Sequence, residues 1–323
     1  MKQFLLVTLV LAATSCVAAT SAAARPRGIN GKIVTNSDNL VTGEEQVYAV
    51  DPDGTNRTLL ANNSETGQWS HDGSRISIGL APFGGAILQF DTGVVTGLSL
   101  DAQYPGVFLG CGVWSADDAR LACEGLSDDN PAFNGIYTVR SSDGSDLRRV
   151  TSDPGGDDCP GDYSPNGQRI AFLRGSFSGP PIGIFTVRAD GSGLREIAAP
   201  VGFVLRFNCP SWSPQRNEIV FSAFAPDGDY RSTLWMVHAN GSGLHEVPIA
   251  GCGGLVDDPN SISCAFPTWS PDGQKILFRR FSPLTGQGDL YTVNADGNGL
   301  TRVTNTPDID EGSAHWGTHL LTP

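Results

Sequence analysis

The fold is decided by the stretch Trp269-Ser270-Pro271-Asp272-Gly273-Gln274-Lys275-Ile276-Leu277-Phe278. Proline at the second position of a turn presets φ, and glycine readily adopts the left-handed conformation. Ser-Pro-Asp-Gly therefore predicts a tight reversal between two short strands. An aromatic residue enters the turn, and alternating apolar residues leave it. Complete or degenerate copies begin at five further aromatic residues: Trp69, Trp114, Tyr163, Trp212 and Trp316.

A second signature recurs between these copies, in which an apolar strand leads into an Asp-Gly or Asn-Gly turn. Ile136-Tyr137-Thr138-Val139 followed by Asp143-Gly144 is one example. Such dipeptides between alternating apolar runs are strong hairpin signals. The aromatic residues are 45 (69 to 114) to 57 (212 to 269) positions apart, which suits the four short strands of one propeller blade. We predict an all-β protein, a six-bladed β-propeller of four-stranded blades.

The two ends of the chain are predicted to complete one blade. Trp316 ends the last copy, and the strands between Gly31 and Leu60 have no Trp-Ser turn before them. Pairing the N-terminal strands with the C-terminal strand in one blade closes the ring and leaves no exposed sheet edge. We therefore expect a single propeller domain at residues 31–323, preceded by a short leader at residues 25–30.

The paired signatures resemble the repeats of the TolB-type six-bladed β-propeller, a WD-like repeat, from about Gly31 to Trp316. The resemblance implies the fold and leaves the function open. TolB-like repeats occur in periplasmic interaction proteins, in the propeller halves of prolyl-oligopeptidase-like enzymes and in many other exported proteins. TolB carries an α/β domain before its propeller, which we do not expect in this chain. The sequence has no Gly-x-Ser-x-Gly motif, so it offers nothing for peptidase chemistry of that kind.

The N-terminal residues differ in composition from the rest of the chain. Lys2 precedes an apolar run and a small-residue site at Ala22-Ala23-Ala24, so residues 1–24 are predicted to be a secretory signal peptide. The run is too short to span a bilayer as a helix, and we expect no transmembrane segment. Ala13-Thr14-Ser15-Cys16 resembles a degenerate bacterial lipoprotein box, so lipidation of Cys16 is an alternative. Both interpretations predict a periplasmic or secreted protein.

Six cysteines remain after residue 24, and an even number in an oxidising compartment favours disulfides. One pair flanks a Trp-Ser turn, one occupies equivalent places in neighbouring blades, and one shares a long loop. The absence of Cys-x-x-C argues against a zinc or redox site. The predicted pairs are Cys111 with Cys123, Cys159 with Cys209, and Cys252 with Cys264.

The chain of 323 residues has a formal net charge of −13 and no basic stripe, which argues against binding to nucleic acid or to anionic membranes. Three long loops are acidic, and converging carboxylates suit Ca²⁺. The alternative is that these are solvated turn residues, since no loop has the Asp-x-Asp-x-Asp-Gly spacing. Apart from possible Ca²⁺, no cofactor is expected. The candidate metal ligands are Asp157, Asp158, Asp310 and Glu311, and Asp257 and Asp258 lie in the third acidic loop.

The residues immediately before the six motif aromatics are candidates for a ring of binding residues. Repeat phase places His315 at the start of an innermost strand, on the face that carries the long loops. A polar ring around the channel mouth would then consist of Gln68, Asp162, Ser211, Thr268 and His315, with Val113 at the sixth position. Ser211, His315 and Asp162 would suit a nucleophile, a base and an orienting acid. The alternative is that these groups only satisfy loop backbone.

The predicted function is that of an exported, monomeric binding or scaffold module that recognises a protein or cell-envelope component through its long-loop face. The alternative is a hydrolase or lyase that acts on a glycan or lactone at the channel mouth, and a third possibility is an envelope lipoprotein with a role in assembly. The motif aromatics are expected to pack between blades. The candidate contact aromatics in or near long loops are Tyr104, Phe108, Phe177, Phe203, Phe224 and Tyr230.

Overall fold

The computed structural model describes residues 28–80, 85–100, 106–176, 183–199, 202–205, 209–225, 231–253, 262–282 and 284–321. The predicted signal peptide, Cys16, Asp257 and Asp258, and three of the loop aromatics (Tyr104, Phe177 and Tyr230) lie outside these ranges. The predictions made for them therefore stay predictions.

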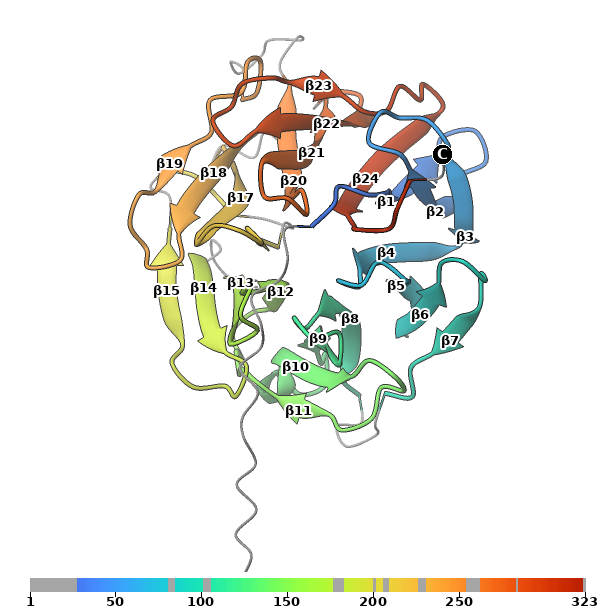
Figure 1. The fold of residues 1–323 in the computed structure, drawn as a ribbon. Helices are drawn as coiled ribbons and strands as arrows, with labels where there is room; N and C mark the ends of the chain where they lie inside the picture. The colour runs from blue at the N-terminus through green and yellow to red at the C-terminus, as the bar shows by residue number, and fades with distance from the viewer. Residues whose placement is uncertain are drawn as a thin grey trace, which may run out of the picture.

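Six four-stranded antiparallel sheets stand around a central axis, as Figure 1 shows, and each has one strand at the channel and one at the outer rim. From the channel outwards, blade 1 consists of β24 (Ile309–Trp316), β1 (Ile33–Asn39), β2 (Glu45–Val50) and β3 (Thr58–Asn62). Blade 2 consists of β4 (Ser64–Trp69), β5 (Arg75–Leu80), β6 (Gly85–Gln89) and β7 (Val95–Gly97). Blade 3 consists of β8 (Phe108–Trp114), β9 (Arg120–Leu126), β10 (Gly135–Arg140) and β11 (Arg148–Arg149), with the 3₁₀ helix η1 (Pro131–Phe133) before β10.

The other three blades have the same order. Blade 4 consists of β12 (Asp158–Tyr163), β13 (Arg169–Arg174), β14 (Gly183–Arg188) and β15 (Arg195–Ala198). Blade 5 consists of β16 (Ser211–Trp212), β17 (Glu218–Phe224), β18 (Ser232–His238) and β19 (His245–Glu246). Blade 6 consists of β20 (Ser263–Trp269), β21 (Lys275–Phe281), β22 (Gly288–Asn294) and β23 (Thr301–Arg302). The six-bladed, four-stranded prediction is confirmed.

The predicted ring closure is also confirmed. In blade 1 the C-terminal strand β24 pairs with β1, with Ile33 opposite Trp316. The indole Nε1 of Trp316 donates to the carbonyl of Gly31 at 2.9 Å. Beyond the paired strands, His319 stacks on Trp69 of blade 2 at 5.5 Å between ring centroids. On the other side, Asn30 donates from Nδ2 to Asp272 of blade 6 at 3.0 Å. The described residues just outside the paired strands therefore tie blade 1 to its two neighbours.

The Trp-Ser turns form for the reasons that the sequence suggested. In blade 6, Ser270 Oγ donates to Asp272 at 2.6 Å and accepts from the backbone N–H of Lys275 at 2.9 Å. Gly273 has a φ of 68°, a conformation that costs glycine little. Its N–H donates to the carbonyl of Ser270 at 2.8 Å. The side-chain bonds of serine and aspartate therefore hold the reversal that glycine permits.

The motif aromatics pack between blades, as predicted. Trp69 of blade 2 is 1% exposed and shares a hydrophobic cluster with Val34 and Val47 of blade 1 and Ile76 of its own blade. Tyr163, Trp212, Trp269 and Trp316 occupy the same position in clusters that each combine two neighbouring sheets. The hydrophobic core is therefore a ring of such interfaces, which holds the channel walls in place.

All three predicted disulfides are present: Cys111–Cys123, Cys159–Cys209 and Cys252–Cys264. The first joins directly paired positions of β8 and β9. Three disulfides suit a protein that folds in an oxidising compartment. Among the described residues, no helix has the length and apolar character needed to cross a membrane.

Candidate functional site

The central channel widens at both ends into a cavity. The long-loop cavity, at the end that carries the long loops, has a volume of about 380 Å³ and is lined by residues from all six blades. The turn-face cavity, at the end that carries the Trp-Ser turns, has a volume of about 640 Å³ and is lined by the motif aromatics and turn prolines. Four of the described residues line both cavities and so mark the middle of the channel: Asp162, Ser211, Thr268 and His315.

The predicted polar ring converges on the channel, but its predicted depth is wrong. His315 is the second-last residue of β24 (Ile309–Trp316), not a residue at its start. Gln68 and Thr268 are likewise second-last in β4 and β20. The ring therefore lies towards the Trp-Ser turns and below the long-loop mouth. Repeat phase gives the position of a residue relative to the motif aromatic. The depth of that residue in the channel also depends on how many residues of the innermost strand come before it.

Ring side chains bind the backbone of the next blade. The aspartate Oδ2 of Asp162 accepts from the N–H of Trp212 at 2.9 Å, and Ser211 Oγ accepts from the N–H of Trp269 at 3.2 Å. His315 Nδ1 accepts from the N–H of Trp69 at 3.2 Å. An innermost strand is a sheet edge, so N–H groups that point into the channel need partners from outside their own ladder. The ring supplies these partners and so joins neighbouring blades.

Two more bonds connect ring members directly. Gln68 of blade 2 donates from Nε2 to Asp162 of blade 4 at 3.2 Å and to the carbonyl of Gly161 at 2.8 Å. Ser211 Oγ donates to Asp162 Oδ2 at 2.8 Å. Both functions of the Ser211 hydroxyl, donor and acceptor, are thus engaged in holding blades 4, 5 and 6 together. The close approach of blades 4 and 5 also requires Gly161, since a Cβ there would lie 1.7 Å from the carbonyl oxygen of Pro210.

The long-loop cavity is acidic. Glu65, Glu124 and Asp162 line it, and no lysine or arginine does so among the described residues. Neither Glu65 nor Glu124 hydrogen-bonds or pairs with a cation in the described part of the chain. Burial raises the pKa of Glu124 to about 7, and the nearby carboxylates Asp157 and Asp158 add to the rise. Sequence reasoning missed Glu124 because it lies on β9, the second strand of its blade, and not on an innermost strand.

Gly110 explains how a second-strand side chain reaches the channel. It lies on the innermost strand β8 directly opposite Glu124 on β9, and both residues line the long-loop cavity. Because Gly110 has no side chain, the innermost strand leaves the Glu124 carboxylate uncovered. A glycine four positions before the motif Trp114, opposite an acidic residue, was the available signal in the sequence.

The structure shows what the four predicted metal ligands contact. Asp158 and Glu311 are fully buried, and each is paired with an arginine, Arg174 and Arg57 respectively. Asp158 accepts from Arg174 Nε and Nη2 at 2.7 Å each. Such buried carboxylates are neutralised by their guanidinium partners.

The other two predicted ligands, Asp310 and Asp157, lie next to these residues in the sequence. Asp310 binds Arg279 at 2.6 Å and also accepts from the N–H of Gly288, while burial raises the pKa of Asp157. No group of three His, Cys, Asp or Glu side chains within the described ranges is arranged to hold a metal ion. Asp157 and Asp158 are in blade 4, whereas Asp310 and Glu311 are in blade 1, so the two acidic loops do not converge.

Aromatic side chains at the long-loop cavity differ in exposure. Phe108 is 41% exposed and lines the cavity, as does Phe266, which sequence reasoning did not select. Phe266 has a φ of 56°, a strained conformation for a bulky residue, where the register of β20 shifts. Phe224 is buried in the core and Phe203 packs edge-on against Trp235. Phe108 and Phe266 are therefore the described aromatics that line this cavity.

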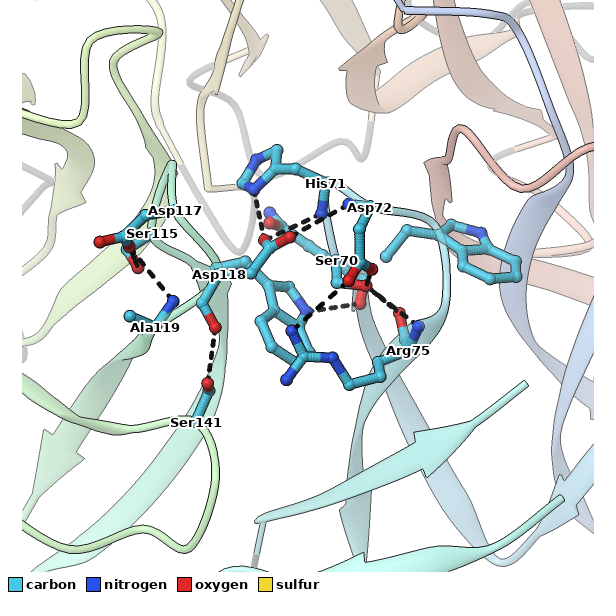
Figure 2. A network of polar contacts seen from close by, with 12 residues as sticks. Ser70, His71, Asp72, Arg75, Ser115, Asp117, Asp118, Ala119 and Ser141 are labelled. Atoms are coloured by element: carbon cyan, nitrogen blue, oxygen red, sulfur yellow. Dashed lines mark hydrogen bonds and ion pairs between the residues drawn. The ribbon is translucent and has the colours of Figure 1, made fainter. Parts of the chain in front are cut away.

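The turn face has its own polar network, which joins blades 2 and 3 (Figure 2). His71 occupies the turn position that holds proline in blades 4, 5 and 6, and unlike proline it has an N–H. That N–H donates to Asp118 Oδ1 at 2.9 Å, and the N–H of Asp72 donates to Asp118 Oδ2 at 3.0 Å. The His71 ring also meets Asp118 at 2.6 Å. The guanidinium of Arg75 lies 4.6 Å from the ring centre of Trp114. This network accounts for His71 as a structural residue.

Comparisons with known proteins agree with this architecture. No protein-family model matches the sequence. TolB from Acinetobacter baumannii matches with a TM-score of 0.69 and 16% identity, over 89% of this chain and 66% of its own. The fold is that of the TolB-type propeller. A putative TolB from Agrobacterium tumefaciens matches with a TM-score of 0.63 and 15% identity, over 88% of this chain and 98% of its own. A chain of a nidogen/laminin complex matches with a TM-score of 0.64 and 9% identity, over 90% of this chain and 99% of its own.

Proposed function

We propose that this TolB-type propeller is an exported binding module that recognises a protein partner through its long-loop face. The observation that carries the proposal is the long-loop cavity, which is walled by residues from all six blades. A concave site on a rigid scaffold, with variable loops around it, is the usual setting for recognition. The half-exposed Phe108 at this cavity provides the kind of aromatic anchor that protein interfaces favour.

Export is part of the same proposal. The three disulfides favour an oxidising compartment, and the signal peptide predicted for residues 1–24 agrees with a periplasmic or secreted protein. One of the structures with this fold is a complex of two proteins, nidogen and laminin. That likeness supports the use of such a propeller as an interaction surface. We expect the free protein to be a monomer, since one chain closes the ring by itself.

The geometry of the ring favours binding over hydrolysis or lysis of a glycan or lactone. A catalytic serine needs a general base that receives its proton and a free lone pair for attack. The Ser211 hydroxyl donates to Asp162 and accepts from the N–H of Trp269, so its proton and one of its two lone pairs are engaged in bonds between blades. His315 Nδ1 is engaged by the N–H of Trp69. These bonds are the ones that hold the blades together, so the ring serves the scaffold.

A photo-crosslinking experiment tests the proposal. A photoreactive amino acid is placed at Phe108, beside the long-loop cavity, and in a control protein at Asp190, an exposed residue of a turn-face Asp-Gly turn. Each protein is irradiated in a cell-envelope extract. We expect a discrete protein adduct from position 108 and none of the same size from position 190. Adducts from position 190 alone, or none from either position, would contradict recognition through the long-loop face.

A further inference from the structure

The carboxylates on the long-loop face fall into two groups, those that are paired with an arginine and those that are not. Asp158 and Glu311 are fully buried and each has an arginine partner, and Asp310 is paired with Arg279. Glu124 is mostly buried as well, yet it has no cation or hydrogen-bond donor among the described residues. An uncompensated buried carboxylate is destabilising. Glu124 lacks such a partner, and the channel wall leaves its carboxylate open to an external one.

The wall around Glu124 has the character of a cation site. Gly110, opposite Glu124, leaves the carboxylate in the cavity surface. Glu65 lines the same cavity from the neighbouring blade. The rings of Phe108 and Phe266 also line it, and aromatic faces attract organic cations. Carboxylates and aromatic rings together, without a described basic residue, complement a positive group that also carries apolar surface.

We propose that the long-loop cavity binds an ammonium or guanidinium group, and that this group is a lysine or arginine side chain of the protein partner. The carboxylate of Glu124 is its main counter-charge, with Glu65 as the second. The identification with a partner side chain rests on the proposed function, whereas the affinity of the cavity for the cation itself does not. A rigid cavity with a fixed counter-charge needs little reorganisation on binding, which favours a single anchoring side chain.

An organic cation fits this cavity better than a metal ion does. Ca²⁺ requires six to eight oxygen ligands, and no group of three candidate ligand side chains is close enough in the described parts of the chain. The cavity volume of about 380 Å³ accommodates the end of a long side chain. Phe108 and Phe266 would then contact the aliphatic part of that side chain or its charged end.

The environment of Glu124 adds a dependence on pH. The pKa of its carboxyl is raised to about 7 by burial, by Asp157 and by Asp158, which face it from blade 4. Asp158 is itself held by Arg174 of β13, and Glu65 faces the same cavity from β4. Below the pKa of Glu124 the main counter-charge is protonated. Cation binding should therefore strengthen as the pH rises through about 7.

Calorimetric titration of the wild-type protein with butylguanidinium tests the cation site without any partner. We expect saturable binding at pH 8.5, at least about tenfold weaker binding at pH 5.5, and no binding of the neutral analogue butylurea. Equal binding of the two compounds would show an apolar cavity and overturn the proposal. A complete lack of butylguanidinium binding, or binding of Ca²⁺ alone, would overturn it too.

Matched variants locate the site. Glu124→Gln keeps the shape of the side chain and removes its charge. We expect this variant to bind butylguanidinium at least about tenfold more weakly than the wild type does. Gly110→Val places a side chain over the Glu124 carboxylate. Gly110→Ala is a smaller change of the same kind, since a Cβ at Gly110 would meet only the Phe108 ring, at 3.6 Å. The control Glu246→Gln removes an exposed charge from the outer strand β19 and should bind like the wild type. Wild-type affinity in Glu124→Gln, or equal losses in Glu246→Gln, would refute the assignment.

The source of the cation is tested by competition. Excess butylguanidinium should suppress the adduct formed from position 108, because both the compound and the partner side chain would occupy the cavity. If the adduct forms and the compound binds without competing, the cation does not come from the partner and that part of the proposal is wrong. If the compound binds and no adduct forms, the proposed partner function fails while the cation site stands.

Discussion

Replacing Glu124 with glutamine should stabilise the protein relative to the wild type, by an amount that grows as the pH rises from about 4.5 to about 7. The ordinary pKa of a glutamate is 4.5, and burial together with Asp157 and Asp158 raises that of Glu124 to about 7. Between these values the folded protein keeps a proton that the unfolded chain has lost, so the free energy of unfolding falls as the pH rises. A difference of about 2.5 pKa units corresponds to a destabilisation on the order of 3 kcal/mol above pH 7. Glutamine has no such proton and avoids this cost.

The assay is urea unfolding with the disulfides intact, followed by tryptophan fluorescence at several values of pH from 4 to 8.5. The measured quantity is the difference in unfolding free energy between Glu124→Gln and the wild type at each pH, which removes contributions from other titrating groups. We expect this difference to be constant below about pH 4.5, to grow in favour of the variant through the intermediate range and to level off above about pH 7. A difference that does not depend on pH would refute the claim that Glu124 is an uncompensated buried carboxylate.

Three further predictions concern the scaffold around the site, and each is measured as a change in the free energy of unfolding. Asp158→Asn should cost about 3 kcal/mol, because it leaves the largely buried Arg174 without its main counter-charge; a neutral result would show that the pair is not needed. Ser211→Ala should cost about 2 kcal/mol, because the buried N–H of Trp269 loses its acceptor; no change would mean that water replaces the hydroxyl. Replacing both cysteines of the disulfide that spans residues 159–209 with serine should cost about 4 kcal/mol, because the bond closes a loop with a sequence separation of 50; a much smaller loss would point to residual order in the unfolded chain.

Much of the fold was predictable because it is repeated. Six aromatic residues in consistent phase gave the number of blades, and the strands left over at both ends gave the closure. The disulfides followed from the same phase: Cys111 and Cys123 flank a turn and are directly paired across β8 and β9. Repetition supplies several independent estimates of the same local geometry, so single departures such as His71 in place of proline do not disturb the result.

The site was less predictable because it depends on what is not repeated. The ring residues were correctly placed on the channel, but phase alone did not show that His315 stands near the end of its strand. Glu124 was missed because its access depends on Gly110 in the neighbouring strand. That relation requires the pairing register of two strands, which the sequence pattern gives only to within a residue or two. The engagement of Asp158, Asp310 and Glu311 was not predictable for a similar reason, since the arginines that pair with them lie elsewhere in the sequence.

The polar ring and the long-loop cavity have different roles in the channel. Ser211, Asp162 and His315 accept N–H groups of the next blade, so their polar atoms stabilise the inner edges of the sheets. This leaves the channel walls stiff at mid-depth and makes the ring a poor source of reactive groups. Glu124 has the opposite effect: its charge lowers the free energy of unfolding as the pH rises towards about 7, and its carboxylate lines the long-loop cavity without a described partner. A cationic partner would offset the destabilisation that the Glu124 carboxylate causes in the free protein, and the fixed channel wall keeps the cost of reorganisation on binding low. We therefore expect recognition to depend on Glu124 and not on the polar ring.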